Sequence, residues 1–514
     1  MKLSPVFNDL NDPATFINHI QELIGNRSDV VRHAEILEKL KEEFEVLDFM
    51  LLTFPQVEKL RKELEQLPRE SEQAEVILKE LGRLKLNQKH YLILSIENVL
   101  RLAEKNHWGL CKNHDFIYLY NSHFWNELDK EQFQKFLGEA AERMGVPKFS
   151  ARFYLFREQL FKQFLSTAYL PAPENSKDKV LINLQNGTFE ISPNGTNLRP
   201  FDRLDFLTYQ LPFKYDLKAE APLFKDYLNK VLPDKERQNI LAEYLGFVFI
   251  KHGSNALKEE KALILYGTGA NGKSVFFEIV NALLGEENVS SYSLQSLTNE
   301  NGYFRAKIGN KLVNYASEIN GILEASIFKQ LVSGEPVEAR LPYGQPFTLK
   351  QYAKLIFNCN ELPKDVEHTN AYFRRFLIIP FDVTIPPEEQ DKNLHTKIIE
   401  NELSGVFNWV MEGLNRLLEQ KRFSVCEAAQ KAVENYKMES DSVQMYLSEY
   451  SYNISIKEEI PLQEMYKEYK YFCEDNGFKA CSLRTLADRL RNSGYKTERK
   501  KYGTIVNAEK KDCF

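Results

Sequence analysis

A glycine-rich segment at residues 267–274 has the residue types and the spacing needed to bind the phosphates of a nucleotide. It fits the pattern G-x-x-x-x-G-K-[ST], in which backbone N–H groups surround the phosphates, the lysine adds positive charge and the hydroxyl holds Mg²⁺. The apolar run 262–266 precedes it, and a helical pattern follows and stops at Gly285. A strand, a glycine loop and a helix N-terminus together favour an anion. The sequence therefore predicts ATP and Mg²⁺ as cofactors, with these contacts: Gly267, Gly269, Asn271, Gly272, Lys273 and Ser274.

An acid and a polar sensor of the nucleotide are expected where two later strands end. Glu318 follows an alternating, strand-like run, and a carboxylate at the C-terminal end of such a strand is placed to polarise the attacking water. Together with Ser274, it is the expected ligand set of Mg²⁺. Asn360 ends the apolar run 354–360 and is suited to hold that water or the γ-phosphate. Lys273, Glu318 and Asn360 are therefore predicted to be catalytic.

Paired arginines, Arg374 and Arg375, stand immediately before the apolar run 376–381. A cation is needed to stabilise the negative charge on the transferred phosphoryl group in the transition state. In an ATPase assembled as a ring, such arginines reach from one subunit into the nucleotide site of the next. We therefore expect Arg375 or Arg374 to be catalytic, with a cluster of salt bridges as the alternative.

A β-hairpin is predicted between the acid and the sensor, within residues 328–348. Arg340, Lys350 and Lys354 supply positive charge there, and Tyr343 supplies an aromatic face. Proteins hold single-stranded nucleic acid with this combination of cations and rings. The hairpin is therefore a predicted contact with single-stranded DNA, and an ordinary surface hairpin is the alternative.

The C-terminal segment carries local positive charge. From Lys479 onward, ten Lys and Arg residues stand against four acids, a net charge of +6. A helix is predicted to begin after an N-cap at Ser482, and residues 496–501 are expected to form a wing beside it. This arrangement predicts duplex DNA contacts at Arg484, Arg489 and Lys500, with docking of a protein as the alternative.

Length and composition limit the classes of protein that the chain can represent. The 514 residues are too many for one core, and a net charge of −6 gives no global attraction to nucleic acid. No segment has the apolar length of a signal peptide or of a membrane span, so no membrane partner is expected. Six scattered cysteines without a C-x-x-C pair predict reduced thiols in a cytoplasm, that of the host if a virus or phage encodes the chain.

The order of the motifs resembles that of superfamily 3 helicases, especially the helicase half of the phage and plasmid primase family and the poxvirus primase-helicase. The resemblance covers the chain from about residue 108 to the C-terminus and leaves the first hundred residues uncovered. The segments that carry it are 184–187, 244–246, 267–274, 316–318, 329–336, 358–363, 374–376, 466–469 and 473–477.

The resemblance implies an α/β AAA+-type P-loop ATPase core with a helical and mixed N-terminal region and a C-terminal winged-helix domain. It implies a homohexameric ring that hydrolyses ATP between subunits and moves single-stranded DNA through its channel, with 3′ to 5′ polarity. Lys329 is implied to act on the neighbour's nucleotide. The expected function is an ATP-dependent DNA helicase of a phage, plasmid or other mobile element, acting in replication. The alternative is an ATP-switched initiator or loader that melts DNA without processive unwinding.

Five domains are expected on this basis. Residues 1–105 form a helical region for oligomerisation or for docking of a replication partner, and 106–221 form a mixed α/β domain. Residues 222–385 form the helicase core, 386–440 a helical extension and 441–514 the winged-helix domain.

The acids Asp9, Asp12 and Asp115 lack the hydrophobic D-x-D frame that binds catalytic metals, so no primer synthesis is expected.

Overall fold

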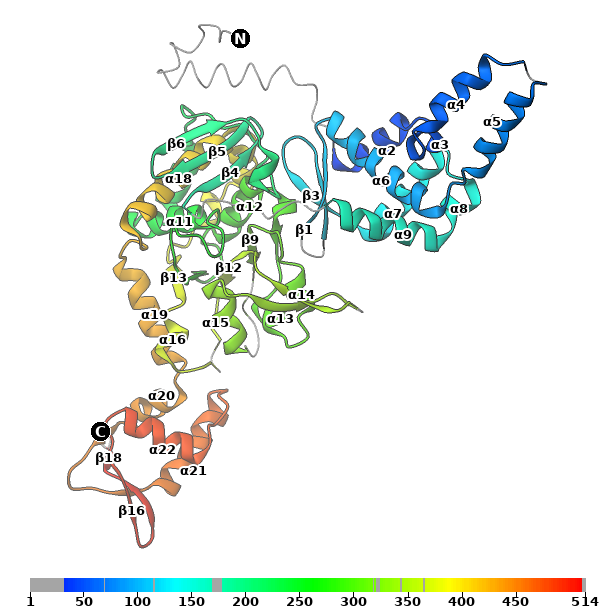
Figure 1. Cartoon of the computed structure of the whole chain (residues 1–514). Helices are drawn as coiled ribbons and strands as arrows, with labels where there is room; N and C mark the ends of the chain where they lie inside the picture. Colours follow the sequence, from blue (N-terminus) through cyan, green and yellow to red (C-terminus); the bar gives the residue numbers. More distant parts are fainter. Residues whose placement is uncertain are drawn as a thin grey trace. The chain divides into compact units, whose positions relative to one another are not determined.

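The computed structural model of the chain is drawn in Figure 1. It describes residues 32–68, 70–113, 116–168, 178–317, 319, 324–342, 344–363 and 366–510. Five residues discussed above lie outside the described residues: Asp9, Asp12, Asp115, Glu318 and Tyr343. The chain divides into two compact units, Met1–Lys214 and Tyr215–Phe514.

The described part of the first unit starts with five helices. These are α2 (His33–Glu43), α3 (Phe49–Thr53), α4 (Gln56–Glu65), α5 (Glu72–Arg83) and α6 (Gln88–Lys105). Of these, α2, α3 and α6 place their apolar faces in one core. Polar side chains cap the starts of α3, α5 and α6, as at Ser71, which accepts the N–H of Ala74 at 3.1 Å. Buried Ile36, Leu40 and Ile96 contribute to the core. The helix-rich pattern predicted for this part of the chain is confirmed where the structure describes it.

Among its described residues, the first unit also contains two small antiparallel sheets and three further α-helices. The first sheet has the order β1 (Gly109–Asn113), β2 (Phe116–Tyr120) and β3 (Trp125–Leu128), and the second has the order β4 (Val180–Leu184), β5 (Gly187–Ser192) and β6 (Gly195–Arg199). Between them lie α7 (Lys130–Arg143), α8 (Lys148–Arg152) and α9 (Tyr154–Thr167). Gln185 and Asn186 form the two-residue turn between β4 and β5, because Leu184 pairs with Gly187. Gly187 has φ +147°, and a Cβ there would lie 2.6 Å from the carbonyl oxygen of Arg199.

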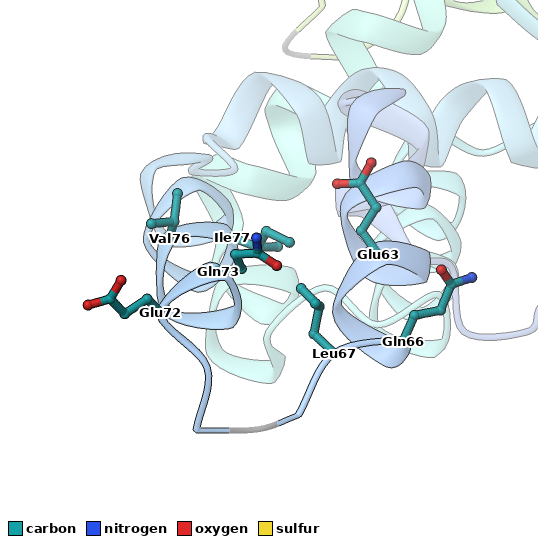
Figure 2. A pocket seen from close by; sticks show the side chains of 7 residues that line it. All are labelled: Glu63, Gln66, Leu67, Glu72, Gln73, Val76 and Ile77. Atoms are coloured by element: carbon teal, nitrogen blue, oxygen red, sulfur yellow. The ribbon is translucent and has the colours of Figure 1, made fainter.

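A cleft lies between the neighbouring helices α4 and α5 (Figure 2). Its volume is about 540 Å³, and apolar Leu67, Val76 and Ile77 share its lining with the carboxylates Glu63 and Glu72. Val76 is 63% exposed, so an apolar part of this helical hairpin faces solvent.

The second unit is built on a five-stranded parallel sheet. Its strands are β7 (Ala262–Tyr266), β8 (Val289–Ser290), β9 (Val313–Ala316), β12 (Lys354–Cys359) and β13 (Phe376–Pro380), in the order β13-β7-β12-β9-β8. The strands are almost wholly buried, which explains their continuous apolar character. Because all the pairs are parallel, the carboxyl ends of the strands lie at one edge.

Helices surround this sheet. They are α10 (Pro222–Val231), α11 (Lys235–Phe247), α12 (Lys273–Leu284), α13 (Leu294–Thr298), α14 (Tyr303–Ala306), α15 (Ala325–Ser333), α16 (Asn370–Phe373), α17 (Leu394–Asn401), α18 (Leu403–Gln420) and α19 (Glu427–Glu439). The packing of α11 on α18 is so close that a Cβ at Gly413 would lie 2.4 Å from the backbone of Ala242. Within the described residues, no helix combines the length and the apolar character needed to cross a bilayer.

The C-terminal part of the second unit has its own apolar core. Its elements are α20 (Ser442–Glu449), β14 (Tyr452–Ile454), β15 (Ile460–Pro461), α21 (Leu462–Asp475), α22 (Leu483–Asn492), β16 (Thr497–Lys500), β17 (Gly503–Val506) and β18 (Ala508–Lys510). Tyr446, Tyr469 and Leu486 lie in the core. The strands β16 and β17 pair directly after α22, at the place where the sequence predicts a wing.

Candidate nucleotide site and nucleic-acid contacts

The phosphate loop lies between β7 and α12, as its flanking residues predict. Gly272 precedes α12 with φ +86°, and a Cβ there would lie 2.7 Å from a methyl carbon of Val231. A Cβ at Gly267 would lie 2.5 Å from the carbonyl oxygen of Phe381. Both positions therefore require glycine, for the close approach of neighbouring elements and, at Gly272, for the positive φ as well.

Hydrogen bonds from distant parts of the unit hold the loop in shape. Asn271 donates from its side-chain amide to the carbonyl of Phe381 at 3.1 Å, and Tyr227 of α10 donates to the carbonyl of Gly272 at 2.8 Å. The backbone N–H of Ile385 donates to the carbonyl of Ala270 at 2.8 Å. These contacts with α10 and with the segment after β13 hold the loop in its shape.

The ammonium of Lys273 points back into the loop. It donates to the carbonyl of Thr268 at 3.2 Å, to the side-chain oxygen of Asn271 at 3.1 Å and to the carbonyl of Gly267. Lys273 is 7% exposed, and its burial lowers the pKa of the ammonium. Because its present partners are neutral acceptors, phosphate oxygens would be stronger partners for the positive charge.

Ser274 is exposed in the first turn of α12, next to Lys273. A hydroxyl at this position, free N–H groups at the helix start and a lysine in the loop fit a magnesium-bound nucleoside triphosphate. The carboxylate expected to share the metal, Glu318, lies outside the described residues. Its neighbours are placed: Ser317 is exposed after β9, and Ile319 is buried.

The register of the sheet places the expected sensor close to the loop. In the parallel pairing, Cys359 of β12 lies opposite Tyr266 of β7, and Phe357 lies opposite Ala316 of β9. Asn360 therefore comes one residue beyond the end of β12, beside the start of the phosphate loop, and it is exposed. The structure thus brings Lys273, Ser274 and Asn360 to one edge of the sheet.

The two arginines occupy different environments. Arg375 is 8% exposed and donates to the hydroxyl of Ser333 at 2.9 Å and to the carbonyl of Ala371. The side chain of Arg374 is 62% exposed. Both guanidinium groups pair with Glu260, at 3.0 Å from Arg374 and 3.1 Å from Arg375. The salt-bridge cluster left open by the sequence is therefore present, and only Arg374 presents an accessible guanidinium.

Lys329 on α15 also has a partner within its own chain. Its ammonium lies 2.9 Å from a carboxylate oxygen of Glu367 and 3.1 Å from the other. Hydrogen bonds from Thr369 and Lys329 lower the pKa of the Glu367 carboxyl, so the carboxylate is charged and neutralises the lysine.

The predicted hairpin is formed by β10 (Val337–Arg340) and β11 (Pro346–Leu349). Arg340 is exposed, and its Nε donates to the carbonyl of Gly344 at 2.9 Å across the tip. Lys350 is exposed directly after β11. These two residues are placed as expected for a hairpin surface, and Tyr343 at the tip lies outside the described residues.

The expectation that Lys354 is a further hairpin cation was wrong. Lys354 is the first residue of β12, and its ammonium lies 3.0 Å from Nδ1 of His252 and 4.3 Å from the ring centre of Phe247. Burial lowers the pKa of Lys354 to about 7. The pKa of His252 is also well below its usual value, first because of burial and then because of Lys354. The long apolar stem of lysine allows the side chain to enter the core with the strand.

The basic residues of the C-terminal part differ in their accessibility. The predicted N-cap is confirmed, since Ser482 Oγ accepts the N–H of Thr485 at 3.2 Å. Arg484 is exposed on the first turn of α22. Arg489 is partly buried 3.6 Å from Asp441, and Lys500 pairs with Glu459 at 2.6 Å. Arg484 is therefore the more available of the two arginines for contact with DNA.

Two curated viral proteins are similar to parts of this chain. "Putative helicase L207/L206" of Acanthamoeba polyphaga mimivirus is 26% identical over 245 residues, which are 44% of this chain and 24% of that protein. "Putative helicase 121R" of Invertebrate iridescent virus 3 is 22% identical over 334 residues, which are 57% of this chain and 35% of that protein. The chain thus spans about a quarter of the length of the mimivirus protein and about a third of the length of the iridescent virus protein.

Three family descriptions match successive parts of the chain. "D5 N terminal like" matches residues 99–233, "Family of unknown function (DUF5906)" matches 265–375, and "Poxvirus D5 protein-like" matches 438–514. The two D5 matches lie on either side of the phosphate loop. Parts of the chain on both sides of this loop are therefore similar to D5-like proteins. Solved structures of the NrS-1 C-terminal region are also similar, with TM-scores of 0.43 and 0.44 at 11% and 13% identity. The first alignment covers 80% of this chain and 97% of the solved chain, and the second covers 79% and 98%, respectively.

The matched segments of the chain contain the site described above. The middle match runs from β7 to Arg375, and the first match includes Tyr227, which holds the phosphate loop. Sequence reasoning missed Tyr227, Glu260 and also Asn358. Asn358 accepts a hydrogen bond from the buried hydroxyl of Tyr315 at 2.9 Å and ties β12 to β9. The two-residue period of a strand places Asn358 on the same face as Asn360 and could have indicated it.

Proposed function

We propose that this chain is an ATP-dependent DNA helicase of superfamily 3, encoded by a virus, phage, plasmid or other mobile element and acting in replication. The observation that carries the proposal is the preshaped phosphate loop with its buried Lys273, beside the carboxyl ends of β12 and β9. The partial matches to D5-like families and the helicase names of the viral relatives support the same proposal.

The strand order supports an AAA+-type core. Because β12 lies between β7 and β9, a polar residue at the end of β12 has the phosphate loop on one side and the acid-bearing strand on the other. Asn360 can then touch the γ-phosphate and the water that Glu318 polarises. Lys273 and the N-terminus of α12 hold the β- and γ-phosphates, and Ser274 and Glu318 would hold Mg²⁺, which neutralises phosphate charge when bound.

Hydrolysis is proposed to occur between subunits of a hexameric ring. The exposed guanidinium of Arg374 has the reach that a residue acting on a neighbour's nucleotide needs, whereas Arg375 is fixed inside its own subunit. Glu260 neutralises Arg374 in the single chain. A neighbour's γ-phosphate carries more negative charge than one carboxylate, so it would compete for the same guanidinium.

Movement on single-stranded DNA is assigned to the β10–β11 hairpin. We expect Tyr343→Ala to keep most DNA-stimulated ATP hydrolysis but to lower strand displacement on a forked duplex by at least about tenfold, the effect of one lost stacking contact. Unwinding of a long fork by the unaltered chain supports a helicase, and melting of only a few base pairs supports the initiator alternative. A Tyr343→Ala chain that unwinds at the unaltered rate would remove the hairpin from the mechanism.

A winged-helix role for residues 441–514 is supported by α22 and the β16–β17 hairpin that follows it. Replacing the exposed Arg484 with alanine is expected to lower duplex DNA affinity about tenfold. The slope of log affinity against log salt concentration should also correspond to about one fewer counterion released on binding. The effect of Arg489→Ala should be smaller, because Asp441 already pairs with that side chain. Lys431→Ala, on the exposed face of α19, serves as a control. Equal duplex affinity for all three variants and the unaltered chain would contradict a DNA-binding role for α22.

A further inference from the structure

A group of aromatic rings is exposed on the first unit, where α8 meets α9. Phe149 is 88% exposed, Tyr154 67% and Phe153 50%. Folded proteins seldom leave several large rings together in solvent unless the surface has a binding role. We define the aromatic–basic patch as these three rings and the cations between them: Lys148, Phe149, Arg152, Phe153, Tyr154 and Arg157.

The backbone beneath the patch is firmly packed, so the rings are held outward by the fold. Ala151 and Phe156 are buried in the core of the unit. The helix α8 ends at Arg152, Phe153 is extended with φ −71° and ψ 130°, and α9 begins at Tyr154. The rings of Phe153 and Tyr154 meet edge to face with their centres 5.0 Å apart.

The charge of the patch is positive. Between residues 147 and 157 there are three cations and no acid. Arg152 is oriented and neutralised by two charge-assisted hydrogen bonds to Glu142 of α7, at 2.8 and 2.9 Å, so the net positive charge of the patch rests on Lys148 and Arg157. Arg157 lies across α7 at Gly138, where a Cβ would be 2.6 Å from its Nε. The absence of a side chain at Gly138 makes room for this guanidinium.

We propose that the aromatic–basic patch binds single-stranded nucleic acid. Every base has a face that can stack on Phe149, Phe153 or Tyr154, while the neighbouring cations neutralise the phosphates. A duplex hides the faces of its bases within the stack, so a single strand fits the exposed rings better. The patch belongs to the unit Met1–Lys214, and the phosphate loop belongs to the other unit. This inference therefore goes beyond the proposed helicase and does not depend on ATP turnover.

The first test measures the affinity of the full chain for a labelled oligo-dT without nucleotide, by fluorescence anisotropy. Phe149→Ala is expected to weaken binding about tenfold, within the range measured for loss of one stacked base. Phe149→Leu should weaken it equally, because leucine is apolar but offers no ring, and Phe149→Trp should retain the affinity. Lys148→Gln should lower both affinity and salt dependence. Val76→Ala, an exposed apolar residue outside the patch, is the control.

A second test is independent of the stability of the variants. Photo-crosslinking of the unaltered chain to an oligonucleotide containing 5-iododeoxyuridine is expected to modify Phe149, Phe153 or Tyr154, mapped by mass spectrometry. Wild-type affinity in both Phe149→Ala and Phe149→Leu, with no adduct between residues 148 and 157, would overturn the proposal. Full affinity in Phe149→Leu alone would also overturn it, since stacking of a base on the ring would then not be what holds the strand.

Discussion

Replacement of Lys273 by alanine is expected to abolish ATP turnover by the full chain, with kcat falling about 100-fold or more. The reason is that Lys273 is the buried cation of the phosphate loop, with its charge directed at neutral acceptors that phosphate oxygens would replace. Phosphate release at saturating ATP measures the effect, and binding of a fluorescent ATP analogue shows whether affinity is lost as well.

The fold should survive this change, because Asn271, Tyr227 and the N–H of Ile385 hold the loop without the lysine. Lys397→Ala is a matched control, since that lysine only pairs with Asp391 on the surface and such pairs contribute at most about 1 kcal/mol. Turnover by Lys273→Ala within a few-fold of the unaltered chain would show that the phosphate loop is not the catalytic site.

Arg374→Ala is expected to lower kcat about 1000-fold, the lower limit for loss of an arginine that stabilises the transition state of phosphoryl transfer, while leaving ATP affinity unchanged. The exposed guanidinium of Arg374 lies on the surface of its own subunit and is proposed to act on the next one. Arg375→Ala should act differently. It removes a buried donor to Ser333 and Ala371, so it should lower the free energy of unfolding by about 1–3 kcal/mol.

Mixing two inactive variants separates action between subunits from action within one. A subunit with Arg374→Ala keeps its own phosphate loop, and a subunit with Lys273→Ala keeps its own Arg374. In a mixed ring, an intact Arg374 from a Lys273→Ala subunit can face an intact phosphate loop on a neighbouring Arg374→Ala subunit, so that interface contains both functional groups. Recovery of ATP hydrolysis on mixing is therefore expected. Absence of recovery, in mixtures shown by sedimentation to assemble, would contradict catalysis between subunits.

The local parts of this structure could be predicted from the sequence because short-range patterns determine them. The strand, glycine loop and helix around residues 267–274 were predicted from the loop motif and the apolar pattern of its flanks. The N-cap at Ser482 follows from the intrinsic preference of serine for this position. The hairpin β10–β11 was indicated by its two short strand-like runs.

Features that depend on tertiary contacts could not be predicted in this way. The sequence does not indicate which of the two neighbouring arginines will be buried with hydrogen bonds to Ser333 and Ala371. Their common ion-pair partner, Glu260, lies far away in the chain. Lys354 has the charge of a surface residue, but its strand runs through the core. Tyr227 supports the phosphate loop from a helix 40 residues earlier, and no local pattern indicates such a partner.

The measurement that tests the account most directly is ATP hydrolysis as a function of protein concentration, with and without single-stranded DNA. The account predicts that specific activity rises steeply with concentration, since each site needs an arginine from a neighbour, and rises again when DNA is added. Specific activity that is independent of both would identify a self-contained ATPase, and it would contradict the proposed ring helicase.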